Sequence, residues 1–267
     1  MAPTCLSEIE HRPWPIPRRP WIMRHTWDDL LFLHWAIPLE SIRPLIPEPI
    51  AIDTFDGKAW IGLVPFRISY LRLRGLPRIP PSSFMELNVR IYVVRDGRPG
   101  VWFLSLDASS RLAVCFARAW YRLPYFPAHM SMTHDGDTIH FTSKRKRAMG
   151  GAFSCSYRPN GESIRPADWP LIRWLTERYC LYTTDQRGRL YCAEIHHIPW
   201  TLQNAEITLD TNDMLSPLGL PNPEGPPLAH FSKRLEAIVW APRRLTAEKY
   251  TLDNQCHPAP PLIHRRA

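Results

Sequence analysis

The chain has 267 residues, of which 45% are hydrophobic and 22% charged, a composition that suits a folded globular protein and excludes a disordered or fibrous one. Its 29 prolines are about twice the usual share, which argues against a bundle of long helices and for many short elements. The formal net charge is +8, from 33 Lys and Arg against 25 Asp and Glu.

What the sequence lacks disfavours several classes of protein. No apolar run approaches the roughly 20 residues of a membrane helix, and residues 1–20 contain no apolar signal-peptide segment. The six cysteines are widely separated, without a Cys-x-x-Cys pair, which is typical of reduced thiols. We therefore expect a cytoplasmic protein that does not associate with membranes.

Four Asx-Gly pairs lie between strand-like runs, and these dipeptides supply the positive φ angles of tight turns. The pairs are Asp56-Gly57, Asp96-Gly97, Asp135-Gly136 and Asn160-Gly161. They predict successive hairpins in a mainly antiparallel sheet. The predicted strands are residues 50–54, 60–70, 84–94, 101–106, 129–133, 138–142, 152–157, 190–198, 205–209 and 229–240.

Helices are predicted at residues 40–45, 110–122 and 169–179. The second is the clearest, because an apolar stripe with helical spacing predicts one buried face. That stripe consists of Leu112, Cys115, Phe116, Ala119 and Trp120. We expect one domain over residues 27–241, preceded by a proline-rich arm at 1–26 and followed by a loosely held tail at 242–267.

The sequence predicts neither a cofactor nor a metal. No glycine-rich phosphate loop follows a predicted strand, and no His-x-His or His-x-x-x-His spacing offers a preformed metal site. The serines lack the glycine-flanked turn of a hydrolase nucleophile. The basic run at 144–147 follows a strand, where charge commonly protects a sheet edge, so we do not expect nucleic-acid binding.

The predicted strand at 84–94 is the most informative segment for function. Its odd-numbered positions from 85 to 93 are all apolar, whereas Glu86, Asn88, Arg90 and Tyr92 share the other face. Two interpretations stay open at this point. The polar face lies either in water or in an enclosed lumen, where Glu86 and Arg90 need each other or a ligand as partners.

Other candidate residues come from three further segments. Arg118 lies off the apolar stripe of the predicted helix and can point into a cleft at its end, with Tyr121 close by in sequence. His34 and Trp35 lie in a strand-like run, and His197 lies at the end of another. We count Tyr121, His34, Trp35 and His197, with Arg90 and Asn88, as candidate ligand-binding residues.

Six segments carry a family resemblance. They are DLLFLHW (29–35), DTFDG (53–57), ELNVR (86–90), PGVWF (99–103), LPYF (123–126) and ERY (177–179). In these segments the chain resembles the YqjF-like bacterial proteins, a group of unknown function in the acetoacetate decarboxylase-like superfamily. The resemblance covers about residues 27–240. It implies a mainly β fold, an antiparallel barrel or cone with a central pocket and a few flanking helices.

The catalytic segment of acetoacetate decarboxylases can be followed along this chain. It reads Gly-Arg-Glu, four further residues, then Pro-Lys-Lys, and its first lysine forms a Schiff base with the substrate. Arg118 and Pro124 match this pattern, whereas Tyr125 and Phe126 replace the two lysines. Glu86 resembles the pocket glutamate of those enzymes.

These departures remove Schiff-base chemistry from the expected function, because an imine requires an amine nucleophile. The pocket arginine of the decarboxylases aligns with Ala36, and the lysines of this chain fall in turns, tails or edge-like segments. The resemblance therefore predicts a related pocket without acetoacetate decarboxylase activity. Because proteins of this superfamily commonly associate, it also suggests a homo-oligomer.

Two functions from different classes follow. The first is a pocket for a small carboxylate or carbonyl compound; if it is catalytic, it acts on a keto acid by acid–base chemistry without an imine. Arg118 or Arg90 would anchor the anion, Glu86 would act as the base, and Tyr125 would donate a proton. The alternative is a non-catalytic binding or sensing protein for a larger hydrophobic molecule, which the 11 Trp, 10 Phe and 9 Tyr suit.

Overall fold

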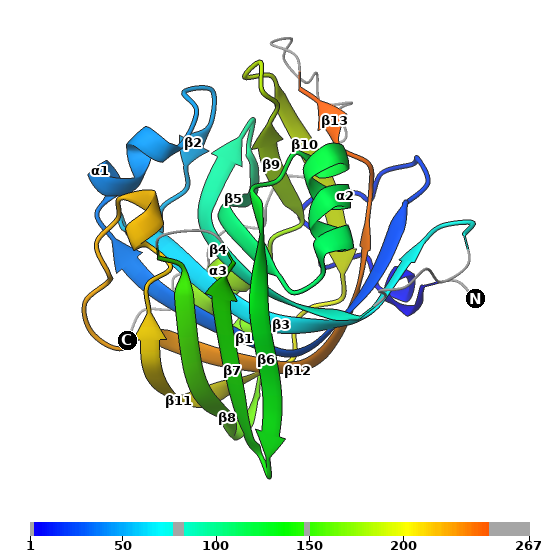
Figure 1. Cartoon of the computed structure of the whole chain (residues 1–267). Helices are drawn as coiled ribbons and strands as arrows, with labels where there is room; N and C mark the ends of the chain where they lie inside the picture. Colours follow the sequence, from blue (N-terminus) through cyan, green and yellow to red (C-terminus); the bar gives the residue numbers. More distant parts are fainter. Residues whose placement is uncertain (1–2, 77–82, 147–149, 246–267) are drawn as a thin grey trace, which may run out of the picture.

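The computed structural model of this chain describes residues 3–76, 83–146 and 150–245. Within these residues the strands form one 13-stranded sheet (Figure 1). The strands are β1 (Met23–Ile37), β2 (Ala51–Ile52), β3 (Ala59–Leu73), β4 (Phe84–Arg95), β5 (Arg98–Ala108), β6 (Tyr125–Asp135), β7 (Thr138–Arg145), β8 (Ala152–Ile164), β9 (Cys180–Thr184), β10 (Leu190–His197), β11 (Leu202–Asn212), β12 (Leu228–Val239) and β13 (Arg243–Arg244). The α-helices are α1 (Leu39–Ile42), α2 (Arg111–Tyr121) and α3 (Pro170–Thr176).

Two strands divide the sheet and close it on itself. β5 pairs with β4 along one edge, and along the other it runs parallel first to β9 and then to β6. In the same way, β12 pairs with β1 on one side and with β11 and β10 on the other. The remaining neighbours are antiparallel, so the strands form a cone-like ring, with α2 packed beside β5 and β6 (Figure 1).

The predicted turn chemistry is confirmed at the β4–β5 hairpin. Asp96 and Gly97 have φ angles of 50° and 71° and join Arg95 to Arg98, which pair directly. The prediction of a turn at Asn160-Gly161 is wrong. Both residues lie inside β8, where Gly161 has a φ of 79° beside a register shift against β11. A positive φ in a strand marks a bulge as readily as a turn.

The core has two parts separated by β1, β3 and β4. One cluster joins the apolar face of β4, including Val89 and Ile91, to Phe141 of β7 and Phe153 of β8. The other clusters lie across the sheet, on the side that carries Phe32. Because β4 is covered on both faces, its polar side chains point into the protein rather than into bulk water.

The ends of α2 are as predicted, but its buried face is not. The Ser110 Oγ accepts a hydrogen bond from the Ala113 N–H at 3.2 Å, and Arg122 ends the helix in the left-handed region with a φ of 56°. The predicted burial of the apolar stripe is wrong, since Leu112 is 67% and Trp120 50% exposed.

Other boundaries also differ from prediction. β9 was not predicted, and the third helix is shorter than residues 169–179 because the chain leaves helical geometry after Thr176. β1 is a full strand of 15 residues. Residues 246–267, which include most of the predicted tail, and Arg147 of the basic run lie outside the described residues. The domain boundaries stay a prediction.

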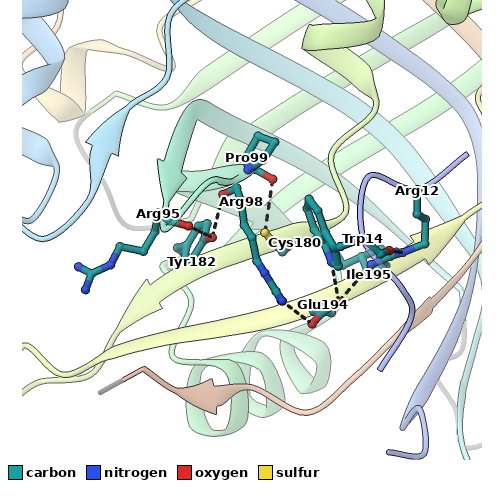
Figure 2. A network of polar contacts seen from close by, with 9 residues as sticks. All are labelled: Arg12, Trp14, Arg95, Arg98, Pro99, Cys180, Tyr182, Glu194 and Ile195. Atoms are coloured by element: carbon teal, nitrogen blue, oxygen red, sulfur yellow. Dashed lines mark hydrogen bonds and ion pairs between the residues drawn. The ribbon is translucent and has the colours of Figure 1, made fainter. Parts of the chain in front are cut away.

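The proline-rich N-terminal segment is held against β10 by a polar network (Figure 2). The fully buried Arg12 side chain donates to the Glu194 Oε2 at 3.0 Å and to the Ile195 carbonyl at 2.6 Å. The Trp14 indole N–H donates to the same carboxylate oxygen, and Arg98 approaches its other oxygen at 3.5 Å. The Glu194 carboxylate therefore takes part in contacts with Arg12, Trp14 and Arg98 at once.

Among the helices described, none has the length and apolarity that a bilayer crossing requires.

We expect Arg12→Ala to lower the free energy of unfolding by about 3 kcal/mol, because it leaves the Glu194 carboxylate partly buried with fewer partners. Chemical denaturation measures this change. Arg158→Ala is the matched control, since its ion pair with Glu206 is exposed and is expected to contribute about 1 kcal/mol or less. Equal effects of the two substitutions would contradict the assigned role of Arg12.

Candidate functional site

A cavity of about 320 Å³ lies inside the ring, between β1, β3, β4, β5, β12 and α2. Most of its lining side chains are apolar. The polar and charged ones are His25, Glu86, Asn88, Arg90, Tyr121, Tyr125, Thr176, Arg178 and His197, with Trp27 and Trp200 among the aromatic ones. Leu112 lines the cavity although it is largely exposed, so the cavity opens to the surface beside α2.

The even-numbered side chains of β4 supply the polar floor of the cavity. Glu86, Asn88 and Arg90 all line it, while Leu87 and Val89 between them point into the core on the other side. The alternation of side chains along a strand produces this separation. Of the two interpretations of this strand, the structure therefore supports the enclosed one.

Glu86 and Tyr125 form a neutral hydrogen-bonded pair. The Tyr125 hydroxyl donates to the Glu86 Oε2 at 2.9 Å. Burial raises the pKa of Glu86 to about 8, although hydrogen bonds with Tyr125 and Asn88 act in the opposite direction. Burial, with the neighbouring Glu86, also raises the pKa of Tyr125 well above its ordinary value. At neutral pH the pair therefore holds two protons.

Two arginines line the same cavity. Arg90 lies with its guanidinium 5.2 Å from the Phe32 ring and donates to the Leu175 carbonyl at 3.3 Å. Arg178 forms an ion pair with Asp53 at 2.6 Å. Burial lowers the pKa of Arg178, and the charge of Arg90 adds to that effect while Asp53 opposes it. Among the described residues, Asp53 is the one carboxylate paired with either arginine.

Several polar atoms of these residues are buried without a hydrogen-bond partner. They are the Asn88 Oδ1, the Arg90 Nε and the Arg178 Nη2. Buried polar groups are nearly always paired in folded proteins, so three orphan atoms at one cavity indicate a place for a polar ligand.

Two more of the predicted binding residues reach the cavity. Tyr121, at the end of α2, lines it and directs its hydroxyl towards the Trp240 carbonyl at 3.5 Å. His197 lines it too, and burial lowers the pKa of its imidazole to about 3. His197 is therefore neutral at physiological pH and offers no positive charge to a ligand.

The structure corrects the placement of three predicted site residues. Arg118 is exposed and donates from its Nε to the Tyr125 carbonyl at 2.6 Å, outside the cavity. His34 is buried behind the lining, with its Nε2 2.7 Å from the Tyr92 hydroxyl. Trp35 points to the opposite core, where its indole N–H donates to the Gly225 carbonyl at 3.1 Å.

A bulge in β1 explains why the side chains of this strand were hard to place. Asp29 has a φ of 51°, and the register against β3 shifts between Asp28 and Leu33. Odd-numbered residues such as Trp27 line the cavity before the bulge, and even-numbered ones such as Phe32 line it after the bulge. Trp35 therefore faces away from the cavity.

Sequence reasoning missed Arg178, His25 and Trp27 as cavity residues. Arg178 follows α3 in an irregular segment, where neither helical nor strand periodicity predicts the direction of a side chain. The ERY segment drew attention to it only as part of a family pattern. His25 and Trp27 precede the bulge in β1, and nothing in their spacing distinguishes them from an ordinary strand.

The described lysines lie elsewhere. Lys58, Lys144 and Lys233 are exposed and Lys146 is half-buried, and none of these four lines the cavity. Lys249 lies outside the described residues. Across residues 3–76, 83–146 and 150–245, no group of three His, Cys, Asp or Glu side chains converges as metal ligands would.

Comparison with known proteins identifies related sequences. A family described as an uncharacterized conserved protein, DUF2071, matches residues 24–236. The "Uncharacterized protein YqjF" of Bacillus subtilis is 45% identical over 230 residues, which are 86% of this chain and 95% of that protein.

Solved structures with a similar fold include an acetoacetate decarboxylase from Legionella pneumophila, with a TM-score of 0.60, 10% identity, and coverage of 89% of this chain and 94% of that one. The enduracididine biosynthesis enzyme MppR complexed with pyruvate has a TM-score of 0.60 and 11% identity. The match covers 89% of this chain and 93% of MppR. An acetoacetate decarboxylase-like enzyme from Sphingomonas wittichii has a TM-score of 0.59 and 12% identity. The match covers 85% of this chain and 94% of that enzyme. These likenesses confirm the predicted fold.

We expect the free energy of unfolding of the wild-type protein to decrease by about 3 kcal/mol, relative to that of Glu86→Gln, as the pH rises from about 5 to about 8. The native state keeps a proton on Glu86 up to its raised pKa of about 8, whereas the unfolded chain releases it above about 4.5. Rising pH therefore favours unfolding of the wild type, and glutamine removes this dependence. Urea denaturation at both pH values measures it.

The exposed Glu206→Gln exchange is the matched control for the loss of one carboxylate and is measured at the same two pH values. If Glu86→Gln and the wild type lose stability in parallel, Glu86 is not protonated in the native state.

Proposed function

We propose that this chain, which belongs to the DUF2071 family of uncharacterized conserved proteins, binds a small carboxylate or carbonyl compound in the cavity beside β4. The observation that carries the proposal is the unequal charge of the cavity. Arg90 and Arg178 are opposed by Asp53, while Glu86 is held neutral. An anionic ligand next to Arg90 would balance this charge.

The ligand would lie with its carboxylate on Arg90 and its body against the apolar walls. A guanidinium presents a planar fork of N–H donors that suits a carboxylate. Phe32 already stacks on one side of the Arg90 guanidinium and restricts its orientation. The apolar side chains that line most of the cavity favour a ligand with a hydrocarbon or aromatic body over a highly polar one.

If the protein is an enzyme, Glu86 and Tyr125 are the groups that would move protons. With a pKa of about 8, Glu86 is mostly protonated at pH 7 and about a tenth ionised, so it donates a proton more readily than it accepts one. In the resting protein, Glu86 is therefore better suited to act as an acid than as the base that its sequence position suggested. A pKa near the working pH suits either direction of transfer.

The proposed chemistry proceeds without an imine. By the resemblance described above, Tyr125 falls where the decarboxylases have their lysine, and its phenol can donate a hydrogen bond but cannot condense with a ketone. The similar structure of MppR was determined with pyruvate, a keto acid. That likeness supports a keto acid as the first class of compound to test here, with acid–base chemistry as the reaction class.

The alternative is a non-catalytic binding or sensing protein for a hydrophobic molecule. The apolar walls and the opening beside Leu112 favour it. The two functions differ in what Glu86 and Tyr125 do. Identification of co-purified metabolites by mass spectrometry, followed by turnover assays with Glu86→Gln and Tyr125→Phe, separates them. Unchanged binding and unchanged chemistry in both variants would contradict the catalytic assignment.

We expect phenylpyruvate to bind the wild type at least about tenfold more tightly than phenylacetone, which has the same aromatic ketone body without a carboxylate. Arg90→Gln should remove this preference, because it deletes the cation assigned to the carboxylate. Isothermal titration calorimetry measures both affinities. Arg187→Gln, in an exposed turn, is the control and should retain the preference. Equal affinity of the wild type for both compounds would contradict the carboxylate site.

We expect no covalent adduct on a cavity residue when the protein is treated with acetoacetate and borohydride, because none of the described lysines lines the cavity. Intact-mass measurement, followed by peptide mapping, detects such an adduct. A reduced adduct on any lysine that forms with acetoacetate, and that phenylpyruvate suppresses, would show that imine chemistry operates after all.

A further inference from the structure

The helix α2 presents an apolar face to the outside of the protein. Its sequence has a regular amphipathic stripe, yet the packed side is the opposite one, formed by Val114 and Tyr121. Leu112 and Trp120 are exposed by 67% and 50%, and Phe116, which contacts Trp120 ring to ring at 5.5 Å, is half-buried. Leu112 and Trp120 are two of the few large apolar side chains that the described surface exposes.

Positive charge follows another side of the same helix. Arg111, Arg118 and Arg122 are all exposed along the same helix and its end. Arg118 and Arg122 lie over the rings of Phe126 and Tyr191, and within the described part of the chain no carboxylate pairs with any of the three arginines. Residues 108–134 contain no Asp or Glu at all.

This charge pattern disfavours a second copy of the chain as the partner. A two-fold interface places the same patch of both subunits face to face, so the three arginines would meet their counterparts with no acidic residue of the segment to balance them. The pattern suits a negatively charged surface with an apolar interior. Basic helices with an apolar face that carries tryptophan have the composition of helices that lie in the headgroup region of membranes.

We propose that α2 docks the protein onto the surface of an anionic bilayer, with Leu112, Phe116 and Trp120 inserted among the lipids and Arg111, Arg118 and Arg122 on the headgroups. This proposal departs from the expectation that the protein has no membrane partner, which rested on the absence of a segment able to span a bilayer. Docking at the surface needs no such segment.

Docking in this way would place the opening of the cavity against the lipid. Leu112 and Phe116 line both the cavity and the exposed face of α2. If the cavity holds the hydrophobic molecule of the alternative function, that ligand could then pass between bilayer and cavity without crossing bulk water. The docking surface does not depend on the identity of the ligand, because its residues other than those two lie outside the cavity.

The test is co-sedimentation of the full chain with vesicles. We expect binding to vesicles of phosphatidylcholine mixed with phosphatidylglycerol, weaker binding at high salt, and little binding to phosphatidylcholine alone. The double substitution Leu112→Ser with Trp120→Ser should reduce partitioning at least about tenfold, as should Arg111→Glu. The double substitution Leu39→Ser with Leu228→Ser is the matched control, since both leucines are exposed on other elements, and it should bind as the wild type does.

The same samples are examined by size-exclusion chromatography with light scattering. If the wild type does not bind anionic vesicles, the proposal is overturned, whether the protein is monomeric or self-associates through α2. Equal vesicle binding by the wild type and both α2 variants also overturns it. Because Arg111→Glu alters an exposed side chain alone, a folding defect in the double variant cannot decide the outcome. Phenylpyruvate binding in solution, which tests the cavity, is independent of these results.

Discussion

The hollow interior exists because β5 and β12 each pair with two different strands along one edge. Along one edge, β5 pairs with β9 near its start and with β6 near its end. One edge of β12 likewise pairs with both β11 and β10, so the sheet divides and then closes. In an undivided sheet, the polar face of β4 would lie in water. Here that face lies inside the ring, and its side chains lose most of their hydration. The electrostatics of the site follow from that loss.

Three charged groups in the cavity respond to this loss of water in different ways. Glu86 becomes neutral and shares a hydrogen bond with Tyr125. Arg178 keeps its charge through the ion pair with Asp53. Arg90 has carbonyl and hydroxyl oxygens as acceptors and lies against Phe32. The cavity is therefore most positive at Arg90, and that position defines the proposed ligand site. The proton on Glu86 is essential to this balance, since an ionised Glu86 would supply the missing negative charge.

The sequence predicted the strands and the polar face of β4 well, because period-2 alternation and Asx-Gly turns are local signals. It failed where position depended on distant pairing. The bulge at Asp29 reverses which side chains of β1 face the cavity, and Arg178 reaches it from an irregular segment. The apolar stripe of α2 has the right spacing for burial, but periodicity shows that a face is apolar without showing what covers it. Leu112 and Trp120 are exposed for that reason.

The protonation state of Glu86 can be measured by titration of its carboxyl with carbon-13 NMR, with the signal assigned by its loss in Glu86→Gln. We expect this carboxyl to stay protonated through neutral pH and to titrate with a midpoint near its raised pKa of about 8. A midpoint near the ordinary value of 4.5 would mean that Glu86 is hydrated and charged at neutral pH. In that case its negative charge would cancel the excess positive charge of the cavity, and none would remain to attract an anion.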